Sequence, residues 1–533
     1  MKALSARTHL AYDDAPAEVT REVKAMVARG EMASFSFSLE AAATTTDLEL
    51  FATPLVSSSG RASPVDIDLH VVHRWPQAGI GVFQSAPVEV GELLLKDDRV
   101  TLRDRYVRSC GNLHLHKSRS RYEGPDLRLK GPVRTSIAAG SSKQFWVSVS
   151  ASRDALPGRY ETSVVVRDEQ QTLLELPLII DVIDVVLMSP VQRTMMWYRG
   201  TINCHHPHHF VRTEIFKAQL ADIFAHGFRD ISLWETDAER LQSALDIAQS
   251  VGFSGDVVLD GFREKLWSSV NFGKLRPVAY VSDEVDAHPA RYAEHADTMK
   301  RARANAVRTM ASVLDWNTSG NVMTAESRPD VLSVYAPANS ERLAASAMRP
   351  DAAGDVYFYW QAHMEKPLVH RLLAGLLLWK SGADGVSPYC YQHLPGVPNS
   401  PFDDFDLWDA TAHSDADGRR FRDHMATYPA RRGVIHTIQW KGLADGITDL
   451  KYLTTLQSAI DAAERSGDPS QRERGNAARK KISSLVERLP WNDLDILSET
   501  SVVPFAGFNA ADMMSLRGEM VELLASLAGG VVA

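Results

Sequence analysis

Residues 194 to 234 read as a strand, a helix and a second strand in succession. The run Thr194-Met-Met-Trp-Tyr198 is short and largely apolar, which is typical of a buried strand. Apolar side chains at 216, 220, 223 and 224 then share one face of a predicted helix, and Gly227 stands where that helix would end. The run Asp230-Ile-Ser-Leu-Trp234 follows as the next strand. The stretch therefore predicts one strand–helix–strand unit.

The same alternation continues toward residue 390. Six further strand-like runs follow, separated by helix-like or polar segments, at 257–259, 277–281, 307–310, 331–335, 355–360 and 385–390. Eight strands that alternate with helices are the layout of a (β/α)₈ barrel of the TIM type. An open, doubly wound sheet has the same alternation, but eight units favour a closed barrel. The fold class is therefore α/β.

The segments on either side of the barrel have different patterns. Between about 31 and 187, polar and apolar residues alternate in short runs separated by Gly/Pro turns, which predicts an N-terminal β-sandwich. The tail after 449 is helical, and its last helix carries a near-heptad stripe of Met513, Leu516, Met520, Leu523 and Leu527. Packing within the chain is the favoured role of that stripe, and a homodimer seam is the alternative. The predicted domains are a sandwich at 1–188, a barrel at 189–448 and helices at 449–533.

Composition narrows the class of protein. The chain has 533 residues, 44% of them apolar and 23% charged, with a net charge of −9, which is typical of a globular protein. A mildly acidic surface argues against nucleic acid as a partner. No run of 18 apolar residues occurs, so no membrane span is expected, and the first 20 residues contain no secretory signal. The cysteines Cys110, Cys204 and Cys390 are few and odd in number, which argues against a disulfide framework. Together these features predict a cytoplasmic protein.

Catalytic side chains of a barrel lie where strands end and the following loops begin. Those positions hold carboxylates and aromatic residues, with no glycine-rich phosphate loop. Aromatic rings stack on sugars and carboxylates carry out glycosidic acid–base chemistry, so the pattern predicts a carbohydrate substrate and no cofactor. The candidate substrate-binding residues are Trp197, Arg199, His205, Trp234, Glu235, Asp315, Trp360, Tyr389, Tyr391, Gln392 and Trp440.

Each candidate has a simpler structural explanation beside the functional one. The tryptophans are sugar platforms or core residues. Arg199 binds a sugar hydroxyl or pairs with a carboxylate. Glu235 and Asp315 bind hydroxyls or cap helices, and Asp237 is the expected cap of the second barrel helix. The histidines around Pro207 lack a zinc-site spacing, so a sugar-binding or solvated loop is favoured there and no metal is predicted.

The adjacent acids Asp283 and Glu284 end the fourth predicted strand. Consecutive residues of a regular strand point to opposite sides, but where the chain turns both can reach one pocket. Adjacent carboxylates suit a substrate-assisted hydrolysis. One acid protonates the leaving oxygen, while the other holds a substrate 2-acetamido group that acts as the nucleophile. A helix cap is the simpler explanation of such a pair.

Several stretches together resemble one known family. They are residues 93–98, 144–147, 156–160, Tyr280-Val-Ser-Asp-Glu284, Tyr359-Trp360, Arg371, 378–385 and 437–453. In this order they resemble glycoside hydrolase family 123, the β-N-acetylgalactosaminidases and their relatives, over about residues 90 to 455. The resemblance implies a sandwich followed by a barrel, in agreement with the periodicity.

The resemblance also implies roles for the acid pair. Glu284 would be the general acid/base, and Asp283 would orient the 2-acetamido group of a terminal β-linked N-acetylhexosamine, with GalNAc preferred and retention of configuration. Lys441 departs from the pattern, because relatives usually carry Glu at that position. Two alternatives stay open: a retaining glycosidase that pairs Glu284 with a nucleophile such as Asp315 or Glu235, and a non-catalytic glycan-binding relative.

Overall fold

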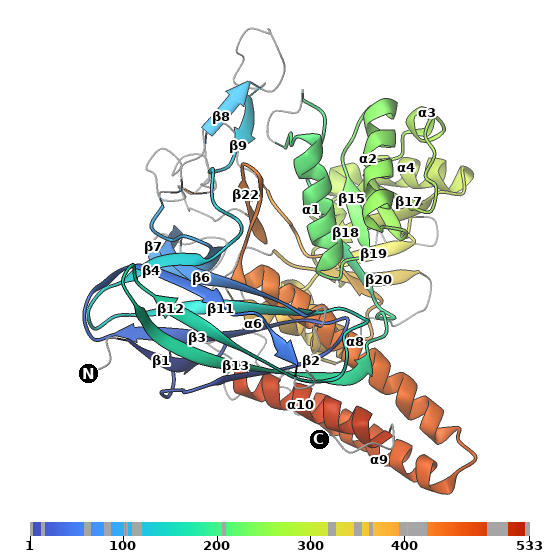
Figure 1. Ribbon diagram of the computed structural model, residues 1–533. Helices are drawn as coiled ribbons and strands as arrows, with labels where there is room; N and C mark the ends of the chain where they lie inside the picture. Colours follow the sequence, from blue (N-terminus) through green and yellow to red (C-terminus); the bar gives the residue numbers. More distant parts are fainter. Residues whose placement is uncertain are drawn as a thin grey trace.

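A sandwich of strands and a barrel lie side by side, with a long helix running between them (Figure 1). The structure is a computed structural model. It describes residues 4–11, 16–57, 65–78, 87–100, 102, 105–108, 120–204, 209–317, 327–345, 354–361, 366–393, 402, 424–487 and 510–527. His205 and Cys110 lie outside the described residues.

The N-terminal part forms the predicted β-sandwich. One sheet has the order β1 (Leu4–His9), β3 (Met32–Ala41), β11 (Ser142–Ala151), β6 (Val65–Ala78) and β7 (Pro87–Leu95). The other has the order β10 (Val133–Ile137), β4 (Thr45–Ala52), β12 (Gly158–Arg167), β13 (Thr172–Val186) and β2 (Val23–Arg29), with β5 (Val56–Ser57) beside β12. Because alternate residues point to opposite faces, Phe145 and Val147 enter the core between the sheets, whereas Trp146 points outward and packs with Ile438. The outer face of the first sheet is therefore covered.

The middle of the chain forms a closed, parallel eight-stranded barrel, so closure is confirmed over the open-sheet alternative. Its strands are β14 (Arg193–Met196), β15 (Asp230–Leu233), β16 (Asp256–Asp260), β17 (Arg276–Ser282), β18 (Arg308–Val313), β19 (Val331–Tyr335), β20 (Asp355–Tyr359) and β21 (Gly385–Val386). Side chains alternate between two environments: Tyr357 joins the cluster inside the barrel, whereas Val356 and Phe358 pack against the surrounding helices.

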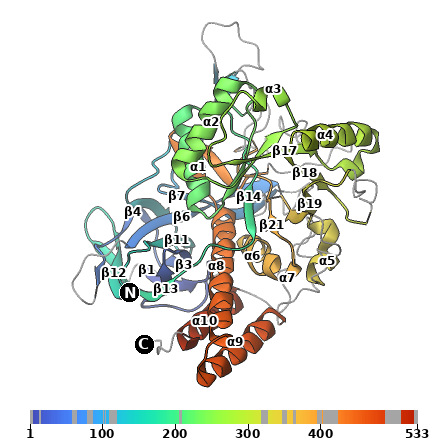
Figure 2. The same ribbon diagram turned by 90° about the vertical axis from the view of Figure 1, so that its right-hand side faces the viewer.

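Helices surround the barrel on its outside (Figure 2). They are α1 (Thr213–Ala225), α2 (Ala238–Val251), α3 (Glu264–Trp267), α4 (Tyr292–Ala304), α5 (Ser340–Ala344), α6 (Pro367–Leu372) and α7 (Leu378–Ser381). Asp237 caps α2 as predicted, accepting a hydrogen bond from the backbone N–H of Arg240. The single helix expected from 367 to 380 contains a π-helical turn at Leu373–Leu377 between α6 and α7, and Gly382 ends it in the left-handed region.

Three long helices complete the chain: α8 (Ile438–Glu464), α9 (Pro469–Glu487) and α10 (Ala510–Leu527). The first half of α8 is almost entirely buried because it packs on both the sandwich and the barrel. The apolar stripe of α10 packs into the main core of the same chain, which is the favoured of its two predicted roles. The domain boundaries and the homodimer stay predictions, and α8 runs across the boundary placed at 448.

Two further antiparallel strand pairs form small sheets of their own: β8 (Arg105–Arg108) with β9 (Ser120–Glu123), and β22 (Thr427–Ala430) with β23 (Gly433–His436), which packs against the sandwich core. Among the described helices, none is long and apolar enough to cross a membrane. Cys204 is disulfide-bonded and Cys390 is a buried free thiol, so a disulfide is present although the cysteine count argues against a disulfide framework. Disulfides persist in oxidising compartments, and the cysteines therefore no longer support a cytoplasmic location, which stays a prediction.

Candidate functional site

A pocket of about 220 Å³ opens at the carboxyl ends of the barrel strands. In (β/α)₈ barrels this end carries the active site. A larger depression lies on the sandwich, but its arginines are paired with its own carboxylates, as Arg167 is with Glu49. The barrel pocket is lined by Trp197, Arg199, Trp234, Tyr280, Asp283, Glu284, Ser312, Ser333, Tyr359, Gln361, Tyr389 and His424.

The backbone turns sharply at the adjacent acids. Strand β17 ends at Ser282, and Glu284 lies in the left-handed region at φ 43° and ψ 48°. A non-glycine residue reaches that region only at a cost of about 1–3 kcal/mol, and such residues cluster at functional sites. The turn breaks the strand alternation, so Asp283 and Glu284 both line the pocket.

Hydroxyl groups hold the two carboxylates. Asp283 Oδ1 accepts hydrogen bonds from the Tyr280 hydroxyl at 2.5 Å and from Ser312 Oγ at 2.9 Å. Ser312 Oγ in turn accepts a bond from the backbone N–H of Glu284 at 2.8 Å, and Tyr359 donates to Glu284 Oε1 at 2.8 Å. Asp283 is therefore fixed by two donors, and Glu284 by its backbone and one carboxylate oxygen.

Burial and neighbouring charges shift the pKa values of Glu284 and of the two tyrosines in the network. Burial raises the pKa of Glu284; the hydrogen bond from Tyr359 opposes this change and the charge of Asp283 adds to it, with a net upward shift. Burial also raises the pKa of Tyr280 and of Tyr359, so both phenols keep their protons and act as donors near neutral pH. A carboxyl group with a raised pKa is suited to general acid catalysis.

Aromatic rings and one arginine form another part of the pocket lining. The Trp197 ring lies edge-on to Tyr280 at 4.7 Å and tilted toward Trp234 at 6.1 Å between ring centroids. Arg199 lies over the Trp234 ring at 5.2 Å and donates from Nη1 to the Tyr389 hydroxyl at 2.7 Å. This combination of flat apolar surfaces and polar donors matches the two faces of a sugar ring.

No protein-family model matches the sequence, and no curated protein matches it. Among solved structures, a family 123 glycoside hydrolase from Clostridium perfringens, analysed for the details of glycolipid glycan hydrolysis, aligns with a TM-score of 0.59. The alignment covers 99% of this chain and 98% of that one at 11% sequence identity. The chain shares the fold of that enzyme. A GH5 xyloglucanase from Bacteroides ovatus also aligns, over 83% of this chain and all of its own (100%) at 7% identity, with a TM-score of 0.28 that is too low to add to the argument.

The family 123 fold predicted from the sequence resemblance is thus confirmed, and the pocket lies where that fold places barrel chemistry. The structure brings one group of the predicted site residues together in this pocket. The group consists of Trp197, Arg199, Trp234, Asp283, Glu284 and Tyr389.

Two of the predicted aromatic platforms are core residues instead. Trp360 is 2% exposed and donates from Nε1 to His370 on the helix side of the barrel wall. Trp440 is fully buried in the first turn of α8, where it stacks on Phe228 at 5.5 Å. Neither ring lines the pocket, because burying a flat apolar ring between strand and helix layers is the commoner use of tryptophan.

Two predicted residues beyond the last barrel strand also lie away from the pocket. Tyr391 is buried and donates to Asp222 Oδ2 at 2.9 Å. Gln392 is buried between Gln219 and Thr427, with which it exchanges amide and hydroxyl hydrogen bonds. Both side chains join the β22–β23 hairpin region to α1, so their role in the structure is to fix the loop that follows Tyr389.

The two predicted barrel carboxylates outside the acid pair bind backbone rather than lining the pocket. Glu235 Oε1 accepts bonds of 2.7 Å from Thr201 Oγ1 and from the backbone N–H of Ile202. Burial raises the pKa of Glu235. Asp315 accepts a 2.8 Å bond from the backbone N–H of Asn317. Each carboxylate therefore shapes a loop above the barrel, and the structure does not bring either one beside Glu284 in the pocket lining.

Sequence reasoning missed the side chains that support the acid pair. Tyr280, Ser312 and Tyr359 lie on β17, β18 and β20 at positions that face the barrel interior. They could have been found by strand alternation: every second residue from a known inward-facing residue also faces the barrel interior. The same count predicts that Ser333 and Gln361 line the pocket, whereas His424 belongs to no barrel strand and has no comparable signal.

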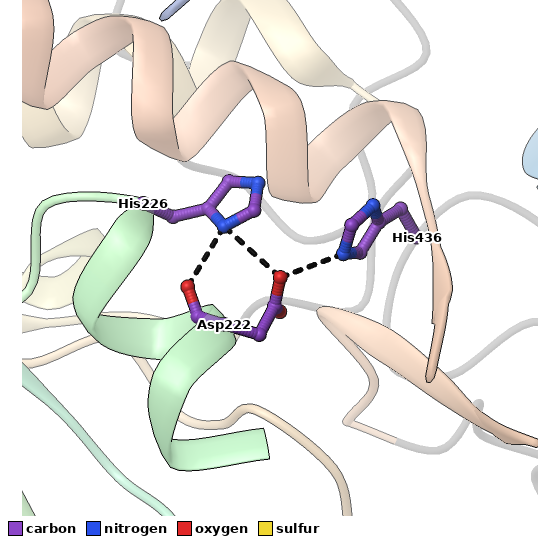
Figure 3. A group of neighbouring side chains, drawn as sticks. All are labelled: Asp222, His226 and His436. Carbon is purple, nitrogen blue, oxygen red and sulfur yellow. Dashed lines mark hydrogen bonds and ion pairs between the residues drawn. The ribbon is translucent and has the colours of Figure 1, made fainter. Parts of the chain in front are cut away.

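A second polar group lies away from this pocket, where α1 meets β23 and α8 (Figure 3). Asp222, His226 and His436 gather ligand-type atoms within 4.8 Å of one another, which is the spacing of a three-ligand metal site. Asp222 Oδ1 lies 2.7 Å from His436 Nε2 and 3.1 Å from His226 Nδ1. Burial opposes ionisation of Asp222, but the two imidazoles hold its pKa well below the usual range.

Lys441 completes this group. Its Nζ lies 3.0 Å from His226 Nε2, and burial lowers the pKa of Lys441. An ammonium group only donates, so Nε2 is the acceptor and the His226 proton sits on Nδ1, directed at the carbonyl oxygen of Asp222 at 2.8 Å. In this arrangement the group is a hydrogen-bonded network, and the departure from the family pattern at Lys441 lies outside the pocket.

Proposed function

We propose that the protein is a glycoside hydrolase that releases a terminal β-linked N-acetylhexosamine, with GalNAc preferred, by a retaining and substrate-assisted mechanism. The observation that carries the proposal is the acid pair in one pocket: Glu284 with a raised pKa, beside Asp283 held by two hydroxyl donors. The aromatic lining and the shared family 123 fold support a carbohydrate substrate.

In the first step, the protonated Glu284 donates its proton to the glycosidic oxygen as the bond from that oxygen to C1 breaks. The carbonyl oxygen of the substrate 2-acetamido group forms the new bond to C1 from the opposite face, which gives an oxazolinium ion. Asp283 accepts the amide N–H of this group and stabilises the positive charge that develops on it. Tyr280 and Ser312 keep Asp283 in position through their hydrogen bonds to Oδ1.

In the second step, the ionised Glu284 removes a proton from water, whose oxygen forms a bond to C1 while the oxazoline C1–O bond breaks. Two inversions at C1 give net retention of configuration. The same carboxyl group thus serves first as acid and then as base, and a pKa raised toward neutrality suits both tasks.

The rival mechanism needs a second carboxylate as the nucleophile, about 5–5.5 Å from the acid and on a different strand. Among the residues that line the pocket, Asp283 is the other carboxylate, and it follows the same strand as Glu284. The carboxylates of Glu235 and Asp315 are bound to backbone N–H groups of neighbouring loops. This arrangement favours assistance by the substrate over the nucleophile mechanism.

The test compares aryl β-GalNAc, β-GlcNAc and β-galactoside as substrates for wild type, Glu284→Gln and Asp283→Asn. We expect cleavage of the acetamido sugars and loss of activity by about 100-fold or more in each variant, together with inhibition by a thiazoline analogue of the intermediate. Cleavage of the β-galactoside as fast as of β-GalNAc would refute assistance by the substrate. Absence of cleavage of every sugar, with glycan binding retained, would favour the non-catalytic alternative.

A further inference from the structure

Arg199 lines the pocket and forms no ion pair with a described carboxylate. Its side chain is half-buried, and its interactions are the hydrogen bond to the Tyr389 hydroxyl and contacts with the Trp234 and Tyr389 rings. Asp283 and Glu284 share the pocket, but their hydrogen bonds are to the hydroxyl groups of the network described above.

Two other half-buried arginines of the barrel have carboxylate partners. Arg193 pairs with Asp230, and Arg308 pairs with Asp256 and Asp355 at the opposite, amino-terminal ends of the strands. A partly desolvated guanidinium is costly without an anion or a full set of acceptors. One phenol oxygen accepts from one of the five N–H donors of Arg199, and the other four have no hydrogen-bond acceptor among the described residues.

Imidazole rings extend this side of the pocket. His424 lines the pocket and lies edge-on to the Tyr389 ring at 5.4 Å. His393 stacks on His424 at 5.7 Å, and His209 stacks on His393 at 5.8 Å. His393 and His424 thus lie beside the Tyr389 ring, whereas the carboxylates belong to the network of Tyr280 and Ser312.

A guanidinium between aromatic rings matches a planar or tetrahedral oxyanion, since its forked donors bind two oxygens at once. We propose that the sugar taken by this pocket carries an anionic substituent, a sulfate ester or a carboxylate, that is bound by Arg199 with His424 beside it. This inference rests on the proposed function and specifies its substrate class.

The experiment compares kcat/KM for 4-nitrophenyl β-GalNAc with its 4-sulfate, its 6-sulfate and the corresponding 6-carboxylate. We expect at least one anionic sugar to be preferred by about tenfold or more, because charge-assisted hydrogen bonds exceed neutral ones. The sulfate and carboxylate arms distinguish the two sources of the charge. Arg199→Met should lower the anionic-to-neutral ratio by roughly 10- to 100-fold, and Arg199→Lys should restore part of it.

Arg240→Met is the matched control, because Arg240 pairs with Asp237 at the start of α2 and does not line the pocket. The ratio should not change in that variant. A neutral sugar cleaved as fast as every anionic one would overturn the inference and leave the proposed function intact.

Loss of cleavage for the whole panel would instead count against the proposed function. Isothermal titration calorimetry with the free sulfated, carboxylated and neutral sugars then decides the inference separately. Binding of an anionic sugar that weakens in Arg199→Met supports it. Equal binding of neutral and anionic sugars, or binding of neither, overturns it.

Discussion

Replacing Tyr359 with phenylalanine tests the acid role of Glu284 most directly. The Tyr359 hydroxyl donates to Glu284 Oε1 at 2.8 Å, and this bond opposes the upward shift that burial and Asp283 impose on the Glu284 pKa. The bond stabilises the ionised carboxylate more than the neutral acid. Tyr359→Phe should therefore raise the pKa of Glu284 further.

The size of the shift follows from the strength of the bond. A hydrogen bond to a charged group contributes about 1.5–3 kcal/mol, and one pKa unit corresponds to about 1.36 kcal/mol, so its loss shifts the pKa by roughly 1–2 units. The protonated acid is the active form in the first step, so activity is lost as pH rises through this pKa. The alkaline limb of the kcat/KM profile should move to higher pH by that amount, while the plateau falls by less than about tenfold because a weaker acid transfers its proton less readily.

The assay is the pH dependence of kcat/KM for an aryl β-N-acetylhexosaminide. Tyr357→Phe is the matched control, because Tyr357 lies two residues earlier on β20 and its buried hydroxyl has no hydrogen-bond partner among the described residues. The control profile should overlay that of wild type. An alkaline limb of Tyr359→Phe that stays in place, or moves to lower pH, would show that Glu284 is not the group whose protonation the profile reports.

Three further predictions concern stability. Arg371→Met breaks a buried bidentate ion pair and should lower the free energy of unfolding by about 3–5 kcal/mol, whereas Arg479→Met, in an exposed pair, should lower it by less than about 1 kcal/mol in the same urea titration. Burial lowers the pKa of His436 to about 4, so stability should fall by up to about 3 kcal/mol as pH drops from about 6.5 to 4, and His436→Gln should flatten that dependence. Gly446→Ala places a Cβ 2.4 Å from the carbonyl oxygen of Arg371 and should lower the melting temperature, whereas Gly518→Ala, with nothing within 4 Å, should not.

The fold was predictable because periodicity reports burial. Strand-like runs at intervals along 194–390 place apolar side chains on both faces of a parallel sheet, and both faces must then be covered. An open sheet with helices on both faces would do this as well, and the number of eight units favoured the closed barrel. The place of the acid pair at a strand end was predictable from the sequence, whereas its catalytic roles came from the family resemblance, because a helix cap is the simpler explanation of such a pair. The disulfide of Cys204 was not predictable, because an odd count of scattered cysteines carries no information about which of them meet.

Trp360, predicted as a sugar platform but buried in the core, shows that the position of a residue at a strand end is not sufficient to place it in the pocket. Trp360 comes at the end of the seventh strand, but its predecessors alternate: Tyr357 faces inward and Phe358 faces the helices. Continuing the count sends Tyr359 into the pocket and Trp360 outward. The choice between neighbouring aromatic residues thus depends on strand parity, which the ring type does not reveal.

The acid pair breaks that parity, and the break is what brings both carboxylates into one pocket. If β17 continued regularly, Asp283 and Glu284 would point to opposite sides, and one of them would face the helices. The left-handed backbone of Glu284 turns both toward the pocket, at a cost that the fold offsets locally, since Ser312 Oγ binds the Glu284 N–H and Asp283 Oδ1 together. One serine on the neighbouring strand therefore links the strained turn to the position of the carboxylate, so the geometry of the two acids is set jointly rather than residue by residue.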